Sequence, residues 1–172
     1  NGGIETHPDY GRAELNLETM DPSLCFVDAR DGHLIGQLRL DAGLHRLSIR
    51  HLAVDAVGRV WFGCQFRGEG ESPQVVGFAT AEGDIRLIDL GAEEGGRLAG
   101  YVGGLAMSRD GETLAVSSPV GGRVLCLDTR TQAVVSGLDL PVSCGVAPAA
   151  QGFLATNGKG MLAGLGDAAD LL

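Results

Sequence analysis

The segments 36-GQLRL-40, 85-IRLIDL-90 and 136-SGLDL-140 are three copies of one pattern, and they decide the fold. They end at Leu40, Leu90 and Leu140, a constant interval of fifty residues, and apolar and polar side chains alternate within them. Alternation with a period of two is typical of a β-strand that is buried on one face. A strand that recurs at a fixed interval indicates a repeat architecture.

Each copy is preceded by an apolar run and a polar turn, which together predict a β-hairpin. The three hairpins are 24-LCFVDARDGHLI-35, 75-VVGFATAEGDIR-86 and 124-VLCLDTRTQAVV-135. Asp28 and Asp128 stand at equivalent positions before the turn, where an Asp carboxylate accepts hydrogen bonds from backbone amides of the turn. We therefore expect these two side chains to cap their turns.

A second kind of hairpin alternates with the first. Its copies are 51-HLAVDAVGRVWFGCQ-65, 104-GLAMSRDGETLAVSS-118 and 145-GVAPAAQGFLATNG-158. The repeating unit thus has four short antiparallel strands, which we letter A to D. Four strands in about 40 to 50 residues are typical of a β-propeller, whose blades bury their faces against one another. The sequence therefore predicts an all-β propeller fold.

The chain holds about three and a half predicted blades in a single domain, residues 1–172. The parts are a long B–C loop at 1–22, half a blade at 23–40, whole blades at 49–90 and 102–140, and an incomplete last blade at 143–165. Propellers close with about four to eight blades, and an open fan leaves apolar faces in water. We expect these faces to be covered by an absent N-terminal half or by a second copy of the chain.

The opening residues Asn1-Gly2-Gly3 match Asn157-Gly158-Lys159, at the end of a predicted B strand. This match predicts that the chain begins at the end of a B strand, and that residues 4–22 join strands B and C. The other B–C loops, at about 66–73 and 118–122, are shorter. A long insertion in one loop of a repeat favours a functional role for that loop.

Charge and composition exclude two classes of partner. The formal net charge is -9, and the 13 Lys and Arg residues are scattered singly. Nucleic-acid binding needs a basic stripe, and a membrane-spanning helix needs roughly 18 consecutive apolar residues. We therefore expect neither a nucleic-acid partner nor a membrane span. The four cysteines form no C-x-x-C pair, and we expect them to be buried free thiols.

Aligned A strands indicate where a ligand would bind. The first residues are Arg50-His51 in one blade, but Gly103-Gly104 and Cys144-Gly145 in the others. Strand A lines the central channel of a propeller, so one blade alone presents a cation and an imidazole at the channel mouth. Arg50 and His51 are therefore the leading candidates for ligand contact. The alternative is that they form hydrogen bonds with neighbouring blades.

The long loop and strand B extend this candidate site. The seven candidate ligand-binding residues are His7, Asp9, Tyr10, Arg12, Arg50, His51 and Cys64. Imidazole, carboxylate and thiolate groups could hold a transition metal, through His7, Asp9, His51 and Cys64. Alternatively, Arg12 and Arg50 could grip a carboxylate or phosphate while Tyr10 stacks on an organic ligand. In the third interpretation, His7-Pro8-Asp9 only stiffens the loop and Asp9 caps a local turn.

Four segments carry a resemblance to a known family. They are 1-NGGIETHPDYGRAELNLETMDPSL-24, 47-LSIRHLAVDAVGRVWFGCQ-65 and 121-GGRVLCLDTRT-131 with 144-CGVAPAAQGFLATNGKG-160. The chain resembles the C-terminal half of the bacterial exported family catalogued as domain of unknown function 1513. The resemblance implies a YVTN/WD40-like propeller of seven blades, a twin-arginine export signal and a periplasmic location. From this resemblance, we expect the family's first blades and its signal to lie outside these 172 residues.

The resemblance also implies a weak link with iron or other metal acquisition, because genes of the family often lie beside those of imelysin-like proteins. No G-x-S-x-G, S-x-x-K or H-E-x-x-H motif is present. We therefore expect a non-enzymatic propeller that binds a partner protein or a small ligand at its loop face and channel mouth. The alternative is an enzyme, lactonase-like or metal-dependent, at the same mouth. The sequence identifies no cofactor.

Overall fold

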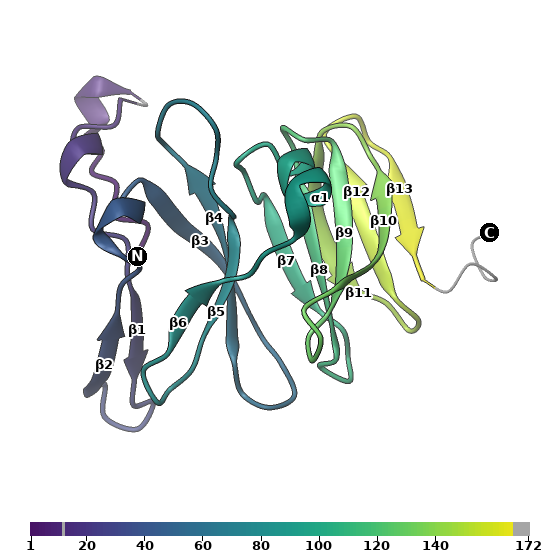
Figure 1. The fold of residues 1–172 in the computed structure, drawn as a ribbon, viewed down its shortest axis with the longest axis horizontal. Helices are drawn as coiled ribbons and strands as arrows, with labels where there is room; N and C mark the ends of the chain where they lie inside the picture. Colours follow the sequence, from purple (N-terminus) through teal and green to yellow (C-terminus); the bar gives the residue numbers. More distant parts are fainter. Residues whose placement is uncertain (12, 167–172) are drawn as a thin grey trace.

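The computed structural model describes residues 1–11 and 13–166 as four antiparallel sheets that stand side by side in chain order (Figure 1). The first sheet contains β1 (Leu24–Val27) and β2 (Leu34–Leu38). The second contains β3 (Leu47–Val54), β4 (Val60–Phe66), β5 (Val76–Ala79) and β6 (Ile85–Leu87). The third contains β7 (Gly104–Met107), β8 (Thr113–Ser118), β9 (Arg123–Asp128) and β10 (Val134–Asp139). The fourth contains β11 (Ser143–Pro148), β12 (Phe153–Asn157) and β13 (Leu162–Leu165).

The predicted all-β propeller fragment is confirmed. Both four-stranded sheets have their strands in sequence order, β3-β4-β5-β6 and β7-β8-β9-β10, so each is a meander that corresponds to strands A to D. The sheets at the two ends of the fan have two and three strands. The seven blades of the parent ring stay a prediction, because the described residues form part of a ring.

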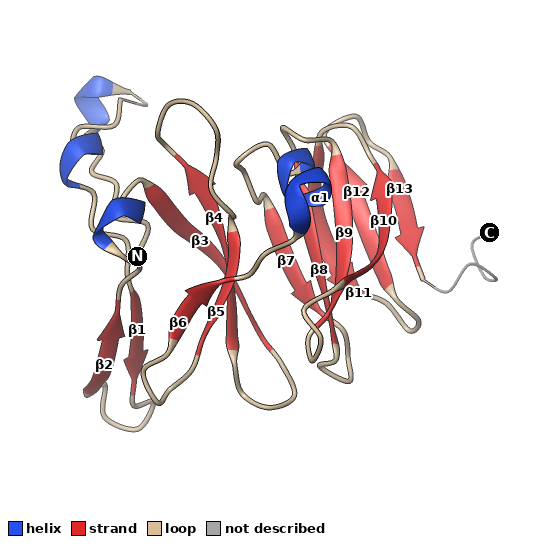
Figure 2. Cartoon of the chain, viewed as in Figure 1, coloured by secondary structure: helices blue, strands red, loops and turns tan. Residues whose placement is uncertain are grey.

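Short helices occur only in the loops of the described chain, as Figure 2 shows. Three are 3-10 turns: η1 (Pro8–Tyr10), η2 (Leu17–Thr19) and η3 (Ala42–Leu44). The fourth is the α-helix α1 (Gly91–Arg97), which lies in the loop between β6 and β7. The sequence 91-GAEEGG-96 predicts a solvated acidic loop; the segment is exposed or half-buried as expected, but it forms a helix, so the prediction of a loop is wrong. The physical reason is a contact with the next blade, described below.

The core lies between the sheets. Trp61 and Phe62 point to opposite faces of β4, and both are fully buried. Aromatic side chains in the middle of a propeller strand are typical of packing between blades, and the complete burial of both rings agrees with this role. Gly63 follows them at a point where a β-carbon would lie 2.4 Å from a methyl carbon of Val102. The blades therefore approach too closely here for any side chain larger than hydrogen.

Buried serines join the third blade to the fourth. Ser117 Oγ donates a hydrogen bond of 2.7 Å to the carbonyl oxygen of Cys144. Ser143 Oγ contacts the carbonyl oxygens of Ser118 and Arg123, at 2.9 and 3.0 Å. These contacts join β11 of the fourth blade to β8 and β9 of the third. The polar groups that join the blades are thus satisfied by short side chains.

Apolar side chains remain exposed at both ends of the fan. On the first blade Leu34 and Ile35 are 51% and 62% exposed, and on the last blade Leu154 and Leu162 are 43% and 65% exposed. These exposed side chains agree with the expectation that further blades or a second copy of the chain cover the ends of the fan.

Both aspartates that were expected to cap turns do so. Asp28 Oδ1 accepts a hydrogen bond of 2.9 Å from the backbone amide of Arg30. Asp128 Oδ1 accepts one of 2.6 Å from the amide of Thr131. These bonds favour the ionised carboxylates, and the pKa of each lies below its usual value, with the Arg30 side chain contributing most at Asp28.

Candidate functional site

The long loop between Gly3 and Pro22 is closed on itself by Asn16. The side-chain oxygen of Asn16 accepts a hydrogen bond of 2.7 Å from the amide of Glu5, and its nitrogen donates one of 2.9 Å to the carbonyl of Gly3. The amide of Leu15 also donates to the carbonyl of Glu5, at 2.9 Å. The two ends of segment 5–15 are therefore held together, as in an Ω-loop.

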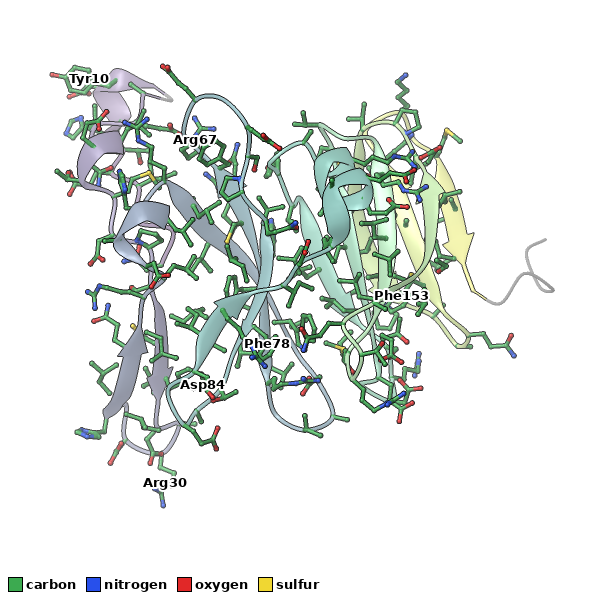
Figure 3. All side chains as sticks on the ribbon, viewed as in Figure 1. Tyr10, Arg30, Arg67, Phe78, Asp84 and Phe153 are labelled. Atoms are coloured by element: carbon green, nitrogen blue, oxygen red, sulfur yellow. The ribbon has the colours of Figure 1, made fainter. Side chains whose placement is uncertain are left out.

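Three ion pairs tie this loop to neighbouring segments. Glu14 pairs with Arg67 on the B–C loop of the second blade. Glu18 and Asp21 pair with Arg46 and Arg39, which lie in the connection between the first two blades. Figure 3 shows Arg67 at the same end of the molecule as Tyr10 of the long loop, with Arg30 at the opposite end. The loop is thus fastened over the first two blades at one end of the propeller.

Asn1, directly before the long loop, pairs with Ser23 as the last residue of the predicted B strand would. The amide of Ser23 donates 3.0 Å to the carbonyl of Asn1, and the amino group of Asn1 donates 3.0 Å to the carbonyl of Ser23. Such an exchange of two hydrogen bonds is the antiparallel pairing of a strand. Asn1 therefore occupies, beside β1, the position that Cys64 occupies beside Val75 in the next blade.

A β-bulge places Arg50 and His51 together. Ile49 pairs with Cys64 and His51 pairs with Gly63, so Arg50 is the extra residue of β3. In a regular strand, consecutive side chains point to opposite faces, but a bulge re-aims one of them. Both residues consequently line the same hollow. Burial, and then the neighbouring Arg50 cation, lower the pKa of His51, so its imidazole is neutral at pH 7.

This hollow, which we call the mouth hollow, lies between the long loop and the start of β3 and has a volume of about 670 Å³. Its lining residues are Gly2, Ile4, Thr6, Gly11, Glu14, Ser48, Ile49, Arg50 and His51. Binding cavities for small molecules usually measure about 300–1,000 Å³. The expected meeting of the long loop with Arg50 and His51 is therefore present in the structure.

Three of the predicted loop residues lie outside the lining of the mouth hollow. His7 Nδ1 accepts a hydrogen bond of 3.2 Å from the amide of Asp9 and begins η1, while the Asp9 carboxylate lies 3.5 Å from the same nitrogen. The ring of Tyr10 stands edge-on to that of His7, with centroids 5.8 Å apart, and Tyr10 is 64% exposed. These contacts agree with a loop-stiffening role for this segment.

Cys64 and Arg12 complete the predicted set. Cys64 is fully buried among apolar side chains, and burial raises the pKa of its thiol to about 12. Metal ligation needs the thiolate, so the expectation that Cys64 meets a ligand beside His51 is contradicted by its position in the core. Arg12 lies outside the described residues. Among the described residues, no three His, Cys, Asp or Glu side chains form a group that could hold a metal ion.

The expectation of four buried thiols also needs correction. All four cysteines are free, but only Cys64 and Cys126 are buried, whereas Cys25 and Cys144 are exposed. Cys25 lies on β1 of the first blade and Cys144 on β11 of the last. No described helix is long and apolar enough to cross a membrane.

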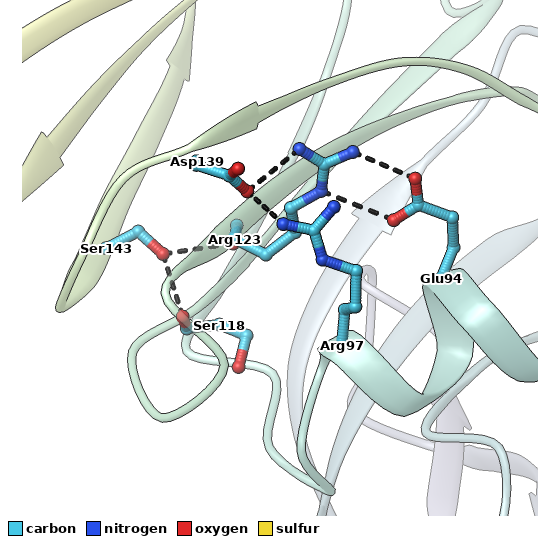
Figure 4. A network of polar contacts seen from close by, with 6 residues as sticks. All are labelled: Glu94, Arg97, Ser118, Arg123, Asp139 and Ser143. Atoms are coloured by element: carbon cyan, nitrogen blue, oxygen red, sulfur yellow. Dashed lines mark hydrogen bonds and ion pairs between the residues drawn. The ribbon is translucent and has the colours of Figure 1, made fainter.

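Helix α1 is held at the same end of the propeller by an ion-pair network (Figure 4). Arg123 of β9 donates 2.8 Å to Glu94 of α1 and 3.0 Å to Asp139 of β10. Arg97, at the end of α1, also pairs with Asp139. This network holds the acidic segment as a helix against the third blade. A second hollow, of about 480 Å³, is lined in part by Gly91, Ala92 and Gly95 of that helix.

Sequence reasoning missed Glu14, Ser48 and Arg67. Glu14 and Ser48 line the mouth hollow, and Arg67 holds Glu14 in place. Glu14 stands in a stretch without periodicity, and Ser48 belongs to no recognisable motif, so neither gives a local signal. The repeat alignment could have found Ser48, because this residue stands two positions before Arg50 at the channel end of strand A.

The described residues form four antiparallel sheets, and the A strands β3, β7 and β11 of successive blades lie next to one another. This arrangement defines the chain as a β-propeller fragment. Solved structures agree. The chain is similar to Kuenenia stuttgartiensis hydrazine synthase, with a TM-score of 0.62 and 19% identity, covering 87% of this chain and 53% of that one. It is similar to Saccharomyces cerevisiae Sqt1 at a TM-score of 0.67 and 13% identity, covering 88% and 40%. The chain is also similar to the β-propeller domain of Myceliophteria thermophila Cps50 (Swd1), with a TM-score of 0.58 and 12% identity, covering 84% of this chain and 48% of that one.

The chain belongs to the family described as "Protein of unknown function (DUF1513)", whose model matches residues 1–170. This confirms the predicted family membership. No curated protein matches the chain. The chain spans about half the length of the solved structures to which it is similar. At these low identities the likeness shows the fold alone.

Proposed function

We propose that this chain is part of a non-enzymatic binding propeller that takes a small ligand, or a short segment of a partner protein, in the mouth hollow. The observation that carries the proposal is the hollow itself, about 670 Å³ between the long loop and β3. Two features of its wall support binding. Asn16 closes the loop on itself, and Glu14 fastens it to Arg67. A wall that is ordered beforehand lowers the entropic cost of binding.

The hollow also offers a mixed chemical lining. Ile4 supplies apolar surface and the exposed hydroxyl group of Thr6 supplies a polar contact. Ile49 and Ser48 also border the hollow but are only 3% and 1% exposed. A largely apolar cavity with a few placed polar groups is the usual form of a ligand site. The hollow is at the end where the B–C loops gather, which is the end that the sequence predicts for binding.

The experiment uses the whole protein and a panel of neutral, cationic and anionic metabolites, screened by ligand-observed NMR. The matched variants are Thr6→Trp, which fills the hollow from its exposed loop wall, and Thr156→Trp, which adds the same ring on the last blade. We expect at least one compound to bind the natural protein and Thr156→Trp but not Thr6→Trp. Binding that Thr6→Trp leaves unchanged would overturn the proposal, and turnover of a bound compound would favour the enzyme alternative.

We also propose that the protein works in the periplasm. Support comes from its membership of a family whose members were expected, from the resemblance, to be exported. Cell fractionation of the whole protein, with and without its natural N-terminal region, tests this. Recovery of the natural protein in the cytoplasmic fraction would overturn it. The link with iron or other metal acquisition stays a prediction, which metal analysis of the purified whole protein would test.

A further inference from the structure

Most arginines of the described chain form an ion pair with a carboxylate, whereas Arg50 in the mouth hollow does not. Seven arginines form ion pairs with carboxylates of the described chain: Arg30, Arg39, Arg46, Arg59, Arg67, Arg97 and Arg123. Arg50 is exposed and forms no ion pair or hydrogen bond with another described residue. Arg86, Arg109 and Arg130 also form no ion pair with described residues, but Arg86 lies over the ring of Phe78 and Arg109 donates to the carbonyl of Ala149. Among these four arginines, Arg50 alone lines the mouth hollow.

The carboxylate that lines the mouth hollow already forms an ion pair with another arginine. Glu14 is the one carboxylate in the described lining of the mouth hollow, and its Oε2 accepts a hydrogen bond of 2.9 Å from Arg67 Nε. The neutral imidazole of His51 does not offset the charge of Arg50. The described lining of the hollow therefore has an uncompensated positive charge, carried by a guanidinium at a β-bulge.

A guanidinium suits one kind of partner group in particular. Its planar fork matches the oxygens of a carboxylate or phosphate, and a charged hydrogen bond of this kind contributes more than a neutral one. The exposed hydroxyl group of Thr6 is a further donor to such oxygens, and His51 offers one donor and one acceptor nitrogen. The lining thus combines one cation with short neutral donors.

We propose that the ligand of the mouth hollow bears an oxyanion, a carboxylate or a phosphate, and that Arg50 is the residue that binds it. The inference rests on the proposed function, because it names the chemical class of the ligand for the same hollow. Arg50 stands at an irregularity of β3, and aligned strands carry glycine or a short side chain there. The position is therefore specific to one blade and is not a repeated requirement of the fold.

The test titrates the whole protein with inorganic phosphate, succinate and benzoate by isothermal calorimetry. The variants are Arg50→Gln, Arg50→Lys and, as a control of equal charge change, Arg130→Gln on the exposed turn between β9 and β10. We expect at least one anion to bind the natural protein and Arg130→Gln equally, about tenfold more weakly to Arg50→Gln, and at an intermediate level to Arg50→Lys. Phosphate binding without succinate or benzoate binding identifies a phosphate ligand, and the reverse identifies a carboxylate.

Three outcomes would overturn the inference. The first is anion binding that Arg50→Gln leaves unchanged, and the second is no anion binding at all. The third is a lower unfolding temperature of Arg50→Gln with no loss of affinity in the folded fraction, which would make Arg50 a contact between blades. In each case, a neutral compound that Thr6→Trp excludes would leave the proposed function standing, so failure of the inference and failure of the proposed function are distinguishable.

Discussion

Arg67 Nε donates a hydrogen bond of 2.9 Å to Oε2 of Glu14, a residue 53 positions earlier in the chain. Both side chains are mostly buried, at 31% and 15% exposure, so solvent screens this pair less than an exposed one. The contact joins the long loop of the first blade to the B–C loop of the second. It makes one wall of the mouth hollow depend on a neighbouring repeat.

Glu14→Gln should loosen this wall. The substitution removes the charge that Arg67 faces, and we expect a loss of about 1 kcal/mol in the free energy of unfolding. Amides of segment 5–16 should exchange hydrogen faster, while those of β8 and β9 stay protected. The control is Glu18→Gln, whose carboxylate is 80% exposed and should matter less. Equal exchange rates in the two variants would show that the pair does not hold the loop.

Asp55 should be a principal determinant of stability at the opposite end of the second blade. Its carboxylate accepts bonds of 2.6 Å from Arg59 Nε and 2.9 Å from Trp61 Nε1. Removing one partner of a buried pair strands the other charge, so Asp55→Ala should cost about 3 kcal/mol in urea unfolding. Arg30→Ala, which breaks an exposed pair, should cost less than about 1 kcal/mol. Similar losses in both variants would contradict this.

The same carboxylate should give the protein an acid-sensitive contribution to stability. Burial opposes ionisation of Asp55, but the bonds from Trp61 and Arg59 outweigh it, and its pKa lies below the ordinary value. A group with a lowered folded pKa stabilises above the pKa of the unfolded chain, about 3.9, and loses this contribution as the pH falls through the folded pKa. Between pH 6 and pH 3, Asp55→Asn should lose less stability than the natural protein. Parallel pH profiles would refute the assignment.

Thiol chemistry should divide the cysteines into two pairs. Cys25 and Cys144 are exposed, whereas burial raises the pKa of Cys64 and Cys126. Ellman's reagent at pH 8 should titrate two of the four cysteines of this chain in the folded protein and all four in urea. Cys25→Ser and Cys144→Ser should each remove one of the fast equivalents. Fast labelling of Cys64 would place its thiol outside the core.

Close packing between blades should make Gly63 intolerant of any side chain. A β-carbon there would lie 2.4 Å from Val102 Cγ1, so Gly63→Ala should cost about 2 kcal/mol or more by thermal unfolding. At Gly36 of β2, a β-carbon would meet no atom within 4 Å. Gly36→Ala should therefore be neutral within about 1 kcal/mol. An equally small effect at Gly63 would mean that the blades can separate without cost.

Much of the fold could be predicted because the strand pattern of one propeller blade recurs at a constant interval in the sequence. The match of Leu40, Leu90 and Leu140 placed strand D of each blade, and Asp28 and Asp128 marked the turns before them. Such signals depend on local geometry: strand alternation and turn capping need only neighbouring residues. The same alignment brought Arg50 and His51 to the channel mouth.

Helix α1 shows where that reasoning failed. The segment 91-GAEEGG-96 has little helical propensity, since glycine disfavours helices. It becomes a helix because Arg123, on the next blade, binds Glu94, and because Arg97 meets Asp139. These partners are distant in the sequence, so a local reading cannot anticipate them.

By itself, the sequence determined the class of fold, the order of the strands and the end of the propeller at which the long loop lies. The physical reason is that burial repeats with the strand period, and the strand pattern repeats with the blade. Only the tertiary structure decided which candidate side chains meet. It placed Cys64 in the core, turned His7, Asp9 and Tyr10 toward one another, and set Arg50 beside His51 through a bulge. Side-chain direction depends on register and on contacts between blades, which come from residues far apart in the chain.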